Sequence, residues 1–415
     1  MKALKKKIVS LLRWSQRYTK TDMVYIAKGS FWLLSGKGAL VLISLTTTVA
    51  FANLLPLETF GTYQFVISVA GIVGISALPG MGTSVVRSIA KGKEGSLALA
   101  FKTKFTWALL GSMVLLAIAL WYYINDNNLL AVSFFIVAPI LPLKLASGVS
   151  ASFWAGKKRF DMTMSLRVLA DVGIAGVTIT ALFLSDNLWI IVLAFFGSTA
   201  FFYGLTYLYT QPKTENGEVD KEMVPLGKSL TVMGAVETLA SHLDKIILWK
   251  VLGPVQVAIY TLSIKPIKKV KGFLPIATLA LPKLSENGVK GYERKRSILR
   301  KVLIMFLVSI PFAVALAVAA PIAYKLLFPQ YMDSVKYFQA LTFLVAMLPA
   351  TLLGTSLIAE MKTKYLYITN TVVPIIKIIL FLILAPIYGI WGIVSALLIM
   401  SVVSAGMNLY FFWKM

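Results

Sequence analysis

Apolar residues fill long, unbroken stretches of this chain. Each stretch is about 20 residues long, the length of a helix that crosses the hydrocarbon core of a bilayer. Membrane-spanning strands alternate in polarity over about 10 residues, so the unbroken runs exclude an outer-membrane barrel. The pattern predicts an all-α membrane protein with about twelve transmembrane helices, over residues 29–52, 60–86, 105–124, 129–156, 162–184, 188–209, 229–252, 257–282, 302–328, 335–359, 365–385 and 390–412.

Basic residues between these helices lie on one side of the membrane. Of the 41 Lys and Arg residues, 29 fall in the chain ends and in alternate loops, whereas the other loops hold none and carry four acids. The positive-inside rule therefore places both termini in the cytoplasm and the protein in the inner (cytoplasmic) membrane. A wrong number of helices would destroy this alternation, so the charges support the count independently of hydropathy.

Composition agrees, because 58% of the residues are hydrophobic, only 14% are charged, and the mean hydropathy is +0.80. A soluble chain of this length needs far more polar surface. We predict a basic amphipathic N-terminus, two six-helix halves and a cytoplasmic linker, over residues 1–28, 29–209, 229–415 and 210–228 respectively. The N-terminus is expected either to lie on the anionic inner leaflet or to act only as a topology signal.

The loops leave no room for a catalytic domain, since outer loops have at most seven residues and inner loops at most 19. The chain has no cysteine and a single histidine, His242, so thiolate chemistry and Cys or His metal clusters are excluded. No glycine-rich phosphate-binding loop is present. We therefore predict a protein that is not an enzyme and has no catalytic residues, metal site or cofactor.

Charged residues inside the predicted helices carry the functional signal. Twelve are basic and only three, Asp171, Glu237 and Asp244, are acidic. A lysine at the bilayer centre costs about 2.5–3.5 kcal/mol, so deep cations must face water or paired acids. The excess predicts a cationic, water-filled lumen that binds an anion. The lumen candidates are Lys37, Lys144, Arg167, Lys265, Lys268, Lys269, Lys271 and Lys377.

Structural alternatives exist for some of these charges. Arg167 and Asp171 are four residues apart on one helix and are placed to pair with each other. Asp244 and Lys245 are adjacent, so each is expected to pair with another helix. Asp171 and Asp244 are also candidates for coupling to H⁺ or Na⁺, and Asp244 is the better of the two because it lies next to Lys245 near the middle of its predicted helix. For Asp244, a permanent salt-bridge role is the competing interpretation.

The two halves echo each other in sequence. A Pro–Tyr–Pro pattern recurs about 198 residues apart, at Pro56, Tyr63 and Pro79 and at Pro254, Tyr260 and Pro275. Six helices per half predict parallel repeats about an axis normal to the membrane, with a binding site between them.

Three segments resemble a known family. Phe51–Gly92 resembles its first hairpin, with Gly61 and Tyr63 at the Gly-x-Tyr positions and a small-residue run that ends at Arg87. LDKIILWKVLGPVQVAIYTLSIKPI carries Asp244 and Lys245 at an Asp-Lys/Arg position, and PIYGIWGIVSALLIMSVVS resembles the last hairpin. The family is the O-antigen and polysaccharide flippases, in the superfamily of MATE-type multidrug extruders and lipid II flippases. Ala258 departs from the second Gly-x-Tyr.

The resemblance implies a V-shaped alternating-access transporter. Its implied substrate is an undecaprenyl-pyrophosphate-linked oligosaccharide, moved from the cytoplasmic to the periplasmic leaflet for O-antigen or other surface polysaccharide. Partners are then this lipid, the bilayer and other polysaccharide assembly proteins, and not nucleic acid. Candidate helix breaks that allow bending are Pro79–Gly82, Pro139, Pro142, Pro266 and Pro275.

Two alternatives remain. A multidrug or cation antiporter of the same fold needs membrane carboxylates to hold its cation, and the excess of basic residues disfavours it. A non-transporting scaffold of a glycan assembly complex is the other, and nothing in the sequence requires it.

Overall fold

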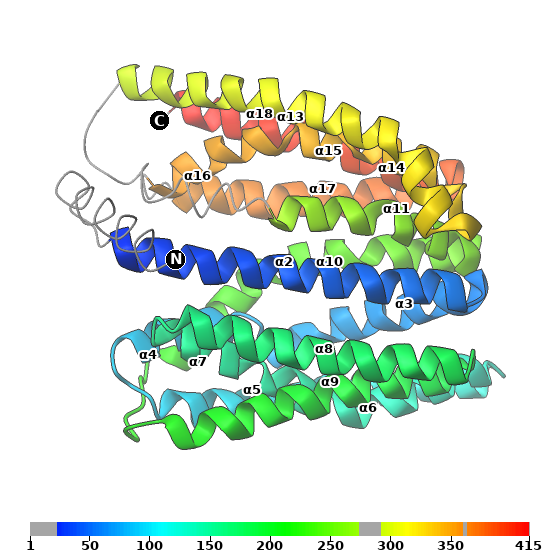
Figure 1. Ribbon diagram of the computed structural model, residues 1–415, viewed down its shortest axis with the longest axis horizontal. Coiled ribbons are helices and arrows are strands. Elements are labelled where there is room, and N and C mark those ends of the chain that lie inside the picture. Colours follow the sequence, from blue (N-terminus) through cyan, green and yellow to red (C-terminus); the bar gives the residue numbers. More distant parts are fainter. Residues whose placement is uncertain (1–22, 274–291, 360–362, 415) are drawn as a thin grey trace, which may run out of the picture.

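The computed structural model describes residues 23–273, 292–359 and 363–414, and this part of the chain folds into helices and turns without strands (Figure 1). The prediction of an all-α fold is confirmed. The first half comprises α2 (Met23–Leu54), α3 (Leu57–Val73), η1 (Gly74–Ala77), α4 (Met81–Ala90), α5 (Ser96–Ile124), α6 (Asn128–Ser147), α7 (Val149–Gly156), α8 (Phe160–Leu184), α9 (Leu188–Thr210) and η2 (Gln211–Lys213).

The second half comprises α10 (Met223–Leu252), α11 (Pro254–Phe273), α13 (Tyr292–Leu327), η3 (Pro329–Tyr331), α14 (Ser334–Leu341), α15 (Phe343–Ala346), η4 (Leu348–Ala350), α16 (Thr351–Ala359), α17 (Thr363–Tyr388) and α18 (Ile390–Lys414). The expected amphipathic segment 1–28 lies almost entirely outside the described residues, and so does Pro275.

Ten helical segments of the described chain are long and apolar enough to cross a membrane. Two predicted spans, α10 and α11, are not among them, although they have 30 and 20 residues. The reason is their charge, because α11 alone carries Lys265, Lys268, Lys269 and Lys271. Both helices nevertheless pack inside the bundle, α10 against α3 and α17 and α11 against α3 and α14, and they complete the predicted twelve.

Prolines affect these helices less than the sequence predicts. The predicted span 60–86 does break, because the helix ends at Ala77, Leu78 takes a φ of 53°, and a new helix begins at Met81 after Pro79. The predicted breaks at Pro139, Pro142 and Pro266 are wrong, since α6 and α11 continue through them.

Side chains from neighbouring helices explain why several helices continue. A proline leaves the carbonyl four residues earlier without its helical donor. Behind Pro142, the Ala138 carbonyl accepts the Ser112 hydroxyl at 2.6 Å. Behind Pro266, the Leu262 carbonyl accepts the Tyr324 hydroxyl at 2.9 Å. Behind Pro321, the Ala317 carbonyl accepts the Gln339 amide at 3.0 Å. The freed backbone groups are therefore satisfied, as a membrane interior requires.

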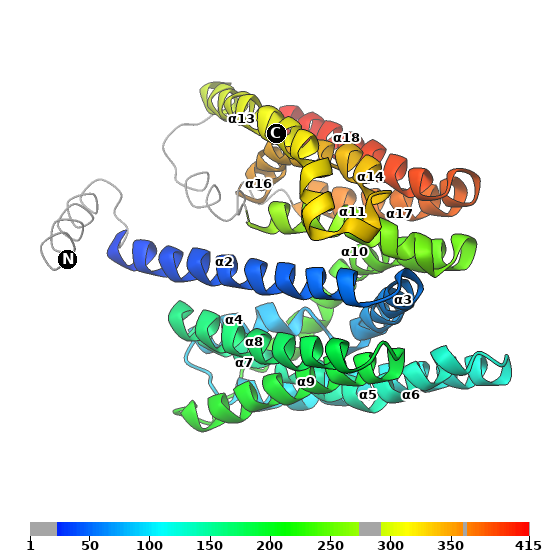
Figure 2. The same ribbon diagram turned by 45° about the vertical axis from the view of Figure 1, so that its right-hand side comes forward.

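The two halves meet in one apolar core, where α10 and α11 pack against α3 (Figures 1 and 2). Phe65 of α3 stacks on Trp249 of α10, with ring centroids 4.3 Å apart. Phe60 of α3 meets Tyr331 edge-on at 6.1 Å. At Gly61 the backbones approach so closely that a Cβ would overlap the carbonyl oxygen of Pro254. The Gly-x-Tyr glycine therefore sits where α3 meets the start of α11.

The linker between the halves is fastened to the first half. The Asn216 side-chain amide donates to the Gly92 carbonyl at 2.8 Å, and the Glu215 N–H donates to the Glu94 carboxylate at 2.8 Å. Lys157 forms ion pairs with Glu94 and, at 3.0 Å, with Glu215. Burial lowers the pKa of Lys157, but its hydrogen bonds to these two carboxylates outweigh burial and raise that pKa above its ordinary value.

Asp220 adds a second attachment of the linker. Burial disfavours its charge, yet hydrogen bonds from the Glu222 N–H, the Ser88 hydroxyl and the Lys91 ammonium lower the pKa of Asp220 below its ordinary value. Its contribution to stability is therefore complete above the pKa of a free aspartate, about 3.9, and is lost as the pH falls through the lower folded pKa. The linker is thus held at neutral pH.

Candidate functional site: a cationic cavity

A cavity of about 520 Å³ lies between the two halves. Its walls come from α2, α3, α6, α8 and α9 of the first half and from α10 and α11 of the second. Its charged lining consists of six basic residues and one acid, listed as Lys144, Arg167, Lys245, Lys265, Lys268, Lys269 and Asp171. We call it the cationic cavity.

Helical spacing explains why these side chains converge. Lys265, Lys268 and Lys269 are three and four residues apart on α11 and therefore share one face. Arg167 and Asp171 share a face of α8 in the same way. Both faces line the same cavity, so two helices that are far apart in sequence bring their charges together there.

No carboxylate of the described residues forms an ion pair with the cations of this cavity. In the part of the chain that the structure describes, the ion pairs within 4.0 Å involve other residues. Lys144 instead lies over the rings of Phe196 and Phe195, with its nitrogen 4.1 and 4.9 Å from their centroids. Aromatic faces attract a cation but do not cancel its charge. The cavity therefore keeps a strong excess of positive charge.

Asp171 is the only acid among the described residues of this lining, and it accepts a hydrogen bond from Tyr203 at 2.8 Å. Among the described residues no ion pair within 4.0 Å joins it to Arg167, so the expected intrahelical pair is not formed. Asp171 faces the cavity, and its carboxylate partner is the phenol of α9 instead.

Asp244 lies elsewhere. Its side chain is buried, with the residue 2% exposed, and does not line the cationic cavity. Its carboxylate accepts the Tyr260 hydroxyl at 2.7 Å and the Lys245 N–H at 2.8 Å. The Tyr260 bond joins α11 to α10, whereas the Lys245 bond lies within α10. Asp244 therefore has the geometry of a structural residue. Its partner is the Tyr260 phenol rather than the expected basic residue.

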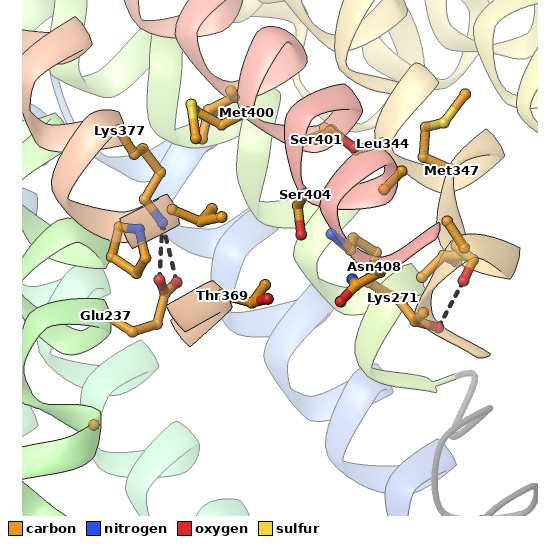
Figure 3. A pocket seen from close by; sticks show the side chains of 18 of the residues that line it. Glu237, Lys271, Leu344, Met347, Thr369, Lys377, Met400, Ser401, Ser404 and Asn408 are labelled. Carbon is orange, nitrogen blue, oxygen red and sulfur yellow. Dashed lines mark hydrogen bonds and ion pairs between the residues drawn. The ribbon is translucent and has the colours of Figure 1, made fainter. Parts of the chain in front are cut away.

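Two of the predicted lumen residues, Lys271 and Lys377, line a second cavity of about 620 Å³ in the second half (Figure 3). There the Lys377 ammonium contacts both carboxylate oxygens of Glu237, at 3.0 and 3.2 Å. Lys37 on α2 lines neither cavity. The eight predicted cations thus divide into five in the cationic cavity, two in the second cavity and one outside both.

Sequence reasoning missed several lining residues. It gave Lys245 only a pairing role, although the excess of basic over acidic residues inside the predicted helices was a usable signal. The uncharged lining, which includes Gln64, Thr199 and Tyr203, had no such signal because hydroxyl and amide side chains are common in membrane helices. Among the described residues, no group of three or more His, Cys, Asp or Glu is placed to hold a metal ion.

A bundle of apolar helices in two halves, with a charged cavity between them, is the architecture of a multi-pass membrane transporter. Residues 26–287 match the family model described as "Polysaccharide biosynthesis protein". The match covers more than half of the chain, and the protein belongs to this family, as the resemblance of the three segments predicted.

Individual proteins agree with that membership. A Shigella flexneri protein named "Putative O-antigen transporter" is 24% identical over 307 residues, which cover 69% of this chain and 72% of that protein. The solved structure of the lipid II flippase MurJ, in an inward closed conformation, has a TM-score of 0.69 at 14% identity, over 92% of this chain and 87% of that one.

An inward-facing MATE family transporter of the MOP superfamily has a TM-score of 0.63 at 15% identity, over 90% of this chain and 93% of that one. At these identities the two structures establish the fold alone, and they confirm the MATE-like arrangement expected from the sequence.

Proposed function

We propose that this protein is a flippase that moves an undecaprenyl-pyrophosphate-linked oligosaccharide from the cytoplasmic to the periplasmic leaflet, for O-antigen or another surface polysaccharide. One observation carries the proposal, the cationic cavity, whose described lining has six basic residues without an ion pair and a single acid. Each deep cation costs about 2.5–3.5 kcal/mol on insertion scales. Six such cations together are costly to place in a membrane. Binding of an anionic ligand, such as a pyrophosphate, offsets that cost.

The rest of the substrate fits the same architecture. Large apolar side chains cover the outer surface of the helices, for example Leu184 at 79% and Leu307 at 75% exposure, so a polyprenyl tail can remain in the bilayer beside them. The polysaccharide family and the relative named as an O-antigen transporter support a glycan cargo.

We further propose that the halves rock about their shared apolar core in an alternating-access cycle, within the inner membrane. The first turn of α2 and the last turn of α18 lie at the same end of the bundle, which supports a common side for both termini (Figure 1). With both termini in the cytoplasm, an inside-negative potential favours outward movement of an anion by about 2.3 kcal/mol per charge per 100 mV.

Return of the empty cationic carrier is the step that calls for a coupling ion, H⁺ or Na⁺. Of the two acids considered, Asp171 is the better placed, because it lines the cationic cavity whereas Asp244 is buried against Tyr260. A cation antiporter is disfavoured by the charge of the same cavity.

The proposal is tested by deleting the gene and restoring it as variants. Loss of a surface polysaccharide on deletion, with accumulation of its lipid-linked repeat unit, is the expected phenotype. Wild type should restore export, and the double variant Lys265→Gln/Lys268→Gln should reduce it at least tenfold at equal protein level. Lys250→Gln, which removes an α10 charge outside both cavities, is the matched control and should export normally. Normal export by the double variant overturns the anion-binding role.

A further inference from the structure

We propose that the second cavity is a separate subsite for the sugar portion of the cargo, a hydroxyl-rich glycan of low charge. We call it the C-terminal cavity, after its walls in α10, α11, α15 to α18 and η4 (Figure 3). The inference rests on the proposed function and extends it, because it assigns the two chemically different parts of one substrate to two different cavities.

Unpartnered polar side chains are the first argument. Ser401, Ser404 and Asn408 follow one another at three- and four-residue steps on α18 and all face this cavity (Figure 3). Many hydroxyls in this bundle bond to a carbonyl of their own helix, as Thr47 does to Ile43 at 2.8 Å, although those of Thr178 and Thr261 in the cationic cavity have no partner among the described residues.

The α18 side chains belong to the group without a partner. Within the described residues, Ser401, Ser404 and Asn408 take part in no hydrogen bond, whereas the cavity residue Thr369 bonds back to Tyr365 at 3.1 Å. Two hydroxyls and an amide therefore present free donors and acceptors to the cavity. Sugar hydroxyls, which both donate and accept, are the complement of such a wall.

Charge is the second argument. The Lys377 ammonium is paired with the Glu237 carboxylate at 3.0 Å, so Lys271 is the one remaining cation of this lining in the described chain. The cationic cavity has six basic residues against one acid. A pyrophosphate will therefore partition into the cationic cavity, and the C-terminal cavity is left to a weakly charged group.

Size and apolar lining are the third argument. A volume of about 620 Å³ lies within the range of about 300–1,000 Å³ that is typical of small-molecule sites. Met233, Met347 and Met400 line it among the polar groups, as Figure 3 shows for the last two. Thioether side chains adapt their shape to a ligand, which suits the apolar faces of sugar rings.

The placement of the cavities links them. On α11, Lys268 lines the cationic cavity and Lys271, three residues later, lines the C-terminal one. On α10, Lys245 lines the cationic cavity and Glu237 lines the C-terminal one. The two cavities thus share these helices as walls. A head group held in one can extend its attached glycan toward the other.

Binding to two lipids that differ only in the glycan tests the subsite. The probes are undecaprenyl pyrophosphate and the lipid-linked oligosaccharide extracted from a strain that lacks this gene, each bound to full-length protein in nanodiscs. The variant Ser404→Ala/Asn408→Leu should bind the glycan-bearing lipid at least tenfold more weakly than wild type and bind undecaprenyl pyrophosphate unchanged. The variant Lys265→Gln/Lys268→Gln should weaken both.

Controls separate a folding defect from a lost subsite. Ser356→Ala removes a hydroxyl of the same half that bonds to Leu353 within its helix and does not line the cavity, so it should bind both lipids as wild type does. Unchanged binding of the glycan-bearing lipid by Ser404→Ala/Asn408→Leu overturns the subsite, as does equal weakening for both lipids. If wild type binds neither probe, the proposed function itself is overturned.

Discussion

At the scale of single residues, side chains of the same type have different roles in different places. Lys377 is neutralised by Glu237, whereas Lys265 has no carboxylate within 4.0 Å in the described chain. Asp171 faces a cavity, but Asp244 is sealed between two helices. Sequence position alone gives all four the same description, an ionisable residue inside a membrane helix. Only their partners show which are structural.

Asp244 provides a prediction at this scale. If its carboxylate joins α10 to α11 through Tyr260, then Tyr260→Phe removes one bond to a buried charge and should cost about 1–3 kcal/mol of stability. Asp244→Asn should lower the thermal midpoint as well and leave the gradient dependence of transport unchanged. Thermal unfolding in nanodiscs measures the first effect. A stable Asp244→Asn protein that no longer responds to a pH or sodium gradient contradicts the structural role and establishes coupling.

The candidate site was predictable in part, for a physical reason. A lysine inside an apolar helix is costly wherever it lies, so its charge alone identified Lys144, Lys265, Lys268 and Lys269 as lumen candidates, and all four line the cationic cavity. Which cavity a lysine reaches depends on helix rotation and packing. For that reason the sequence did not separate Lys271 and Lys377, which face the second cavity, or exclude Lys37.

At the scale of elements, hydropathy located the spans well and located their interruptions poorly. Whether a proline breaks a helix depends on what its neighbours offer to the freed carbonyl. The hydroxyls of Ser112 and Tyr324 supply that bond behind Pro142 and Pro266. Both donors are distant in sequence from the prolines that they compensate. The predicted helix breaks at Pro142 and Pro266 are therefore wrong because of tertiary contacts that no local sequence pattern encodes.

A double-mutant cycle tests this compensation. Tyr324→Phe leaves the buried Leu262 carbonyl without its donor and should destabilise the protein by about 1–3 kcal/mol. In a Pro266→Ala background the backbone N–H returns to that carbonyl, so the same Tyr324→Phe change should cost much less. Unfolding midpoints of the four proteins in one detergent give the coupling. Equal costs in the two backgrounds would show that the tyrosine does not serve the proline.

At the scale of the whole molecule, the two six-helix halves pack against each other through one apolar core. The linker is tied to the first half through Asn216 and Asp220, and the halves meet where α3 packs on α10 and α11. Gly61 allows the closest approach of that contact. The cationic cavity is bounded by helices of both bodies, so movement of one body against the other changes access to it.

Topology is the prediction that belongs to this scale. Cysteines at Asn127 and Asp186, in predicted outer loops, should react in intact cells with an impermeant thiol reagent, because the natural chain has no cysteine to compete. A cysteine at Asn216, in the linker, should react only after the cells are opened. Labelling at Asn216 in intact cells would show that the linker faces outward. The proposed orientation, and the direction of transport that depends on it, would then be wrong.

The most direct test of the central claim is transport in liposomes that contain only the purified protein and an undecaprenyl-pyrophosphate-linked oligosaccharide. Movement of the glycan between leaflets is followed by its accessibility to an added glycosidase. We expect wild type to accelerate the movement, Lys250→Gln to match wild type, and Lys265→Gln/Lys268→Gln to be at least tenfold slower. Movement no faster with wild type than in protein-free liposomes would contradict the account.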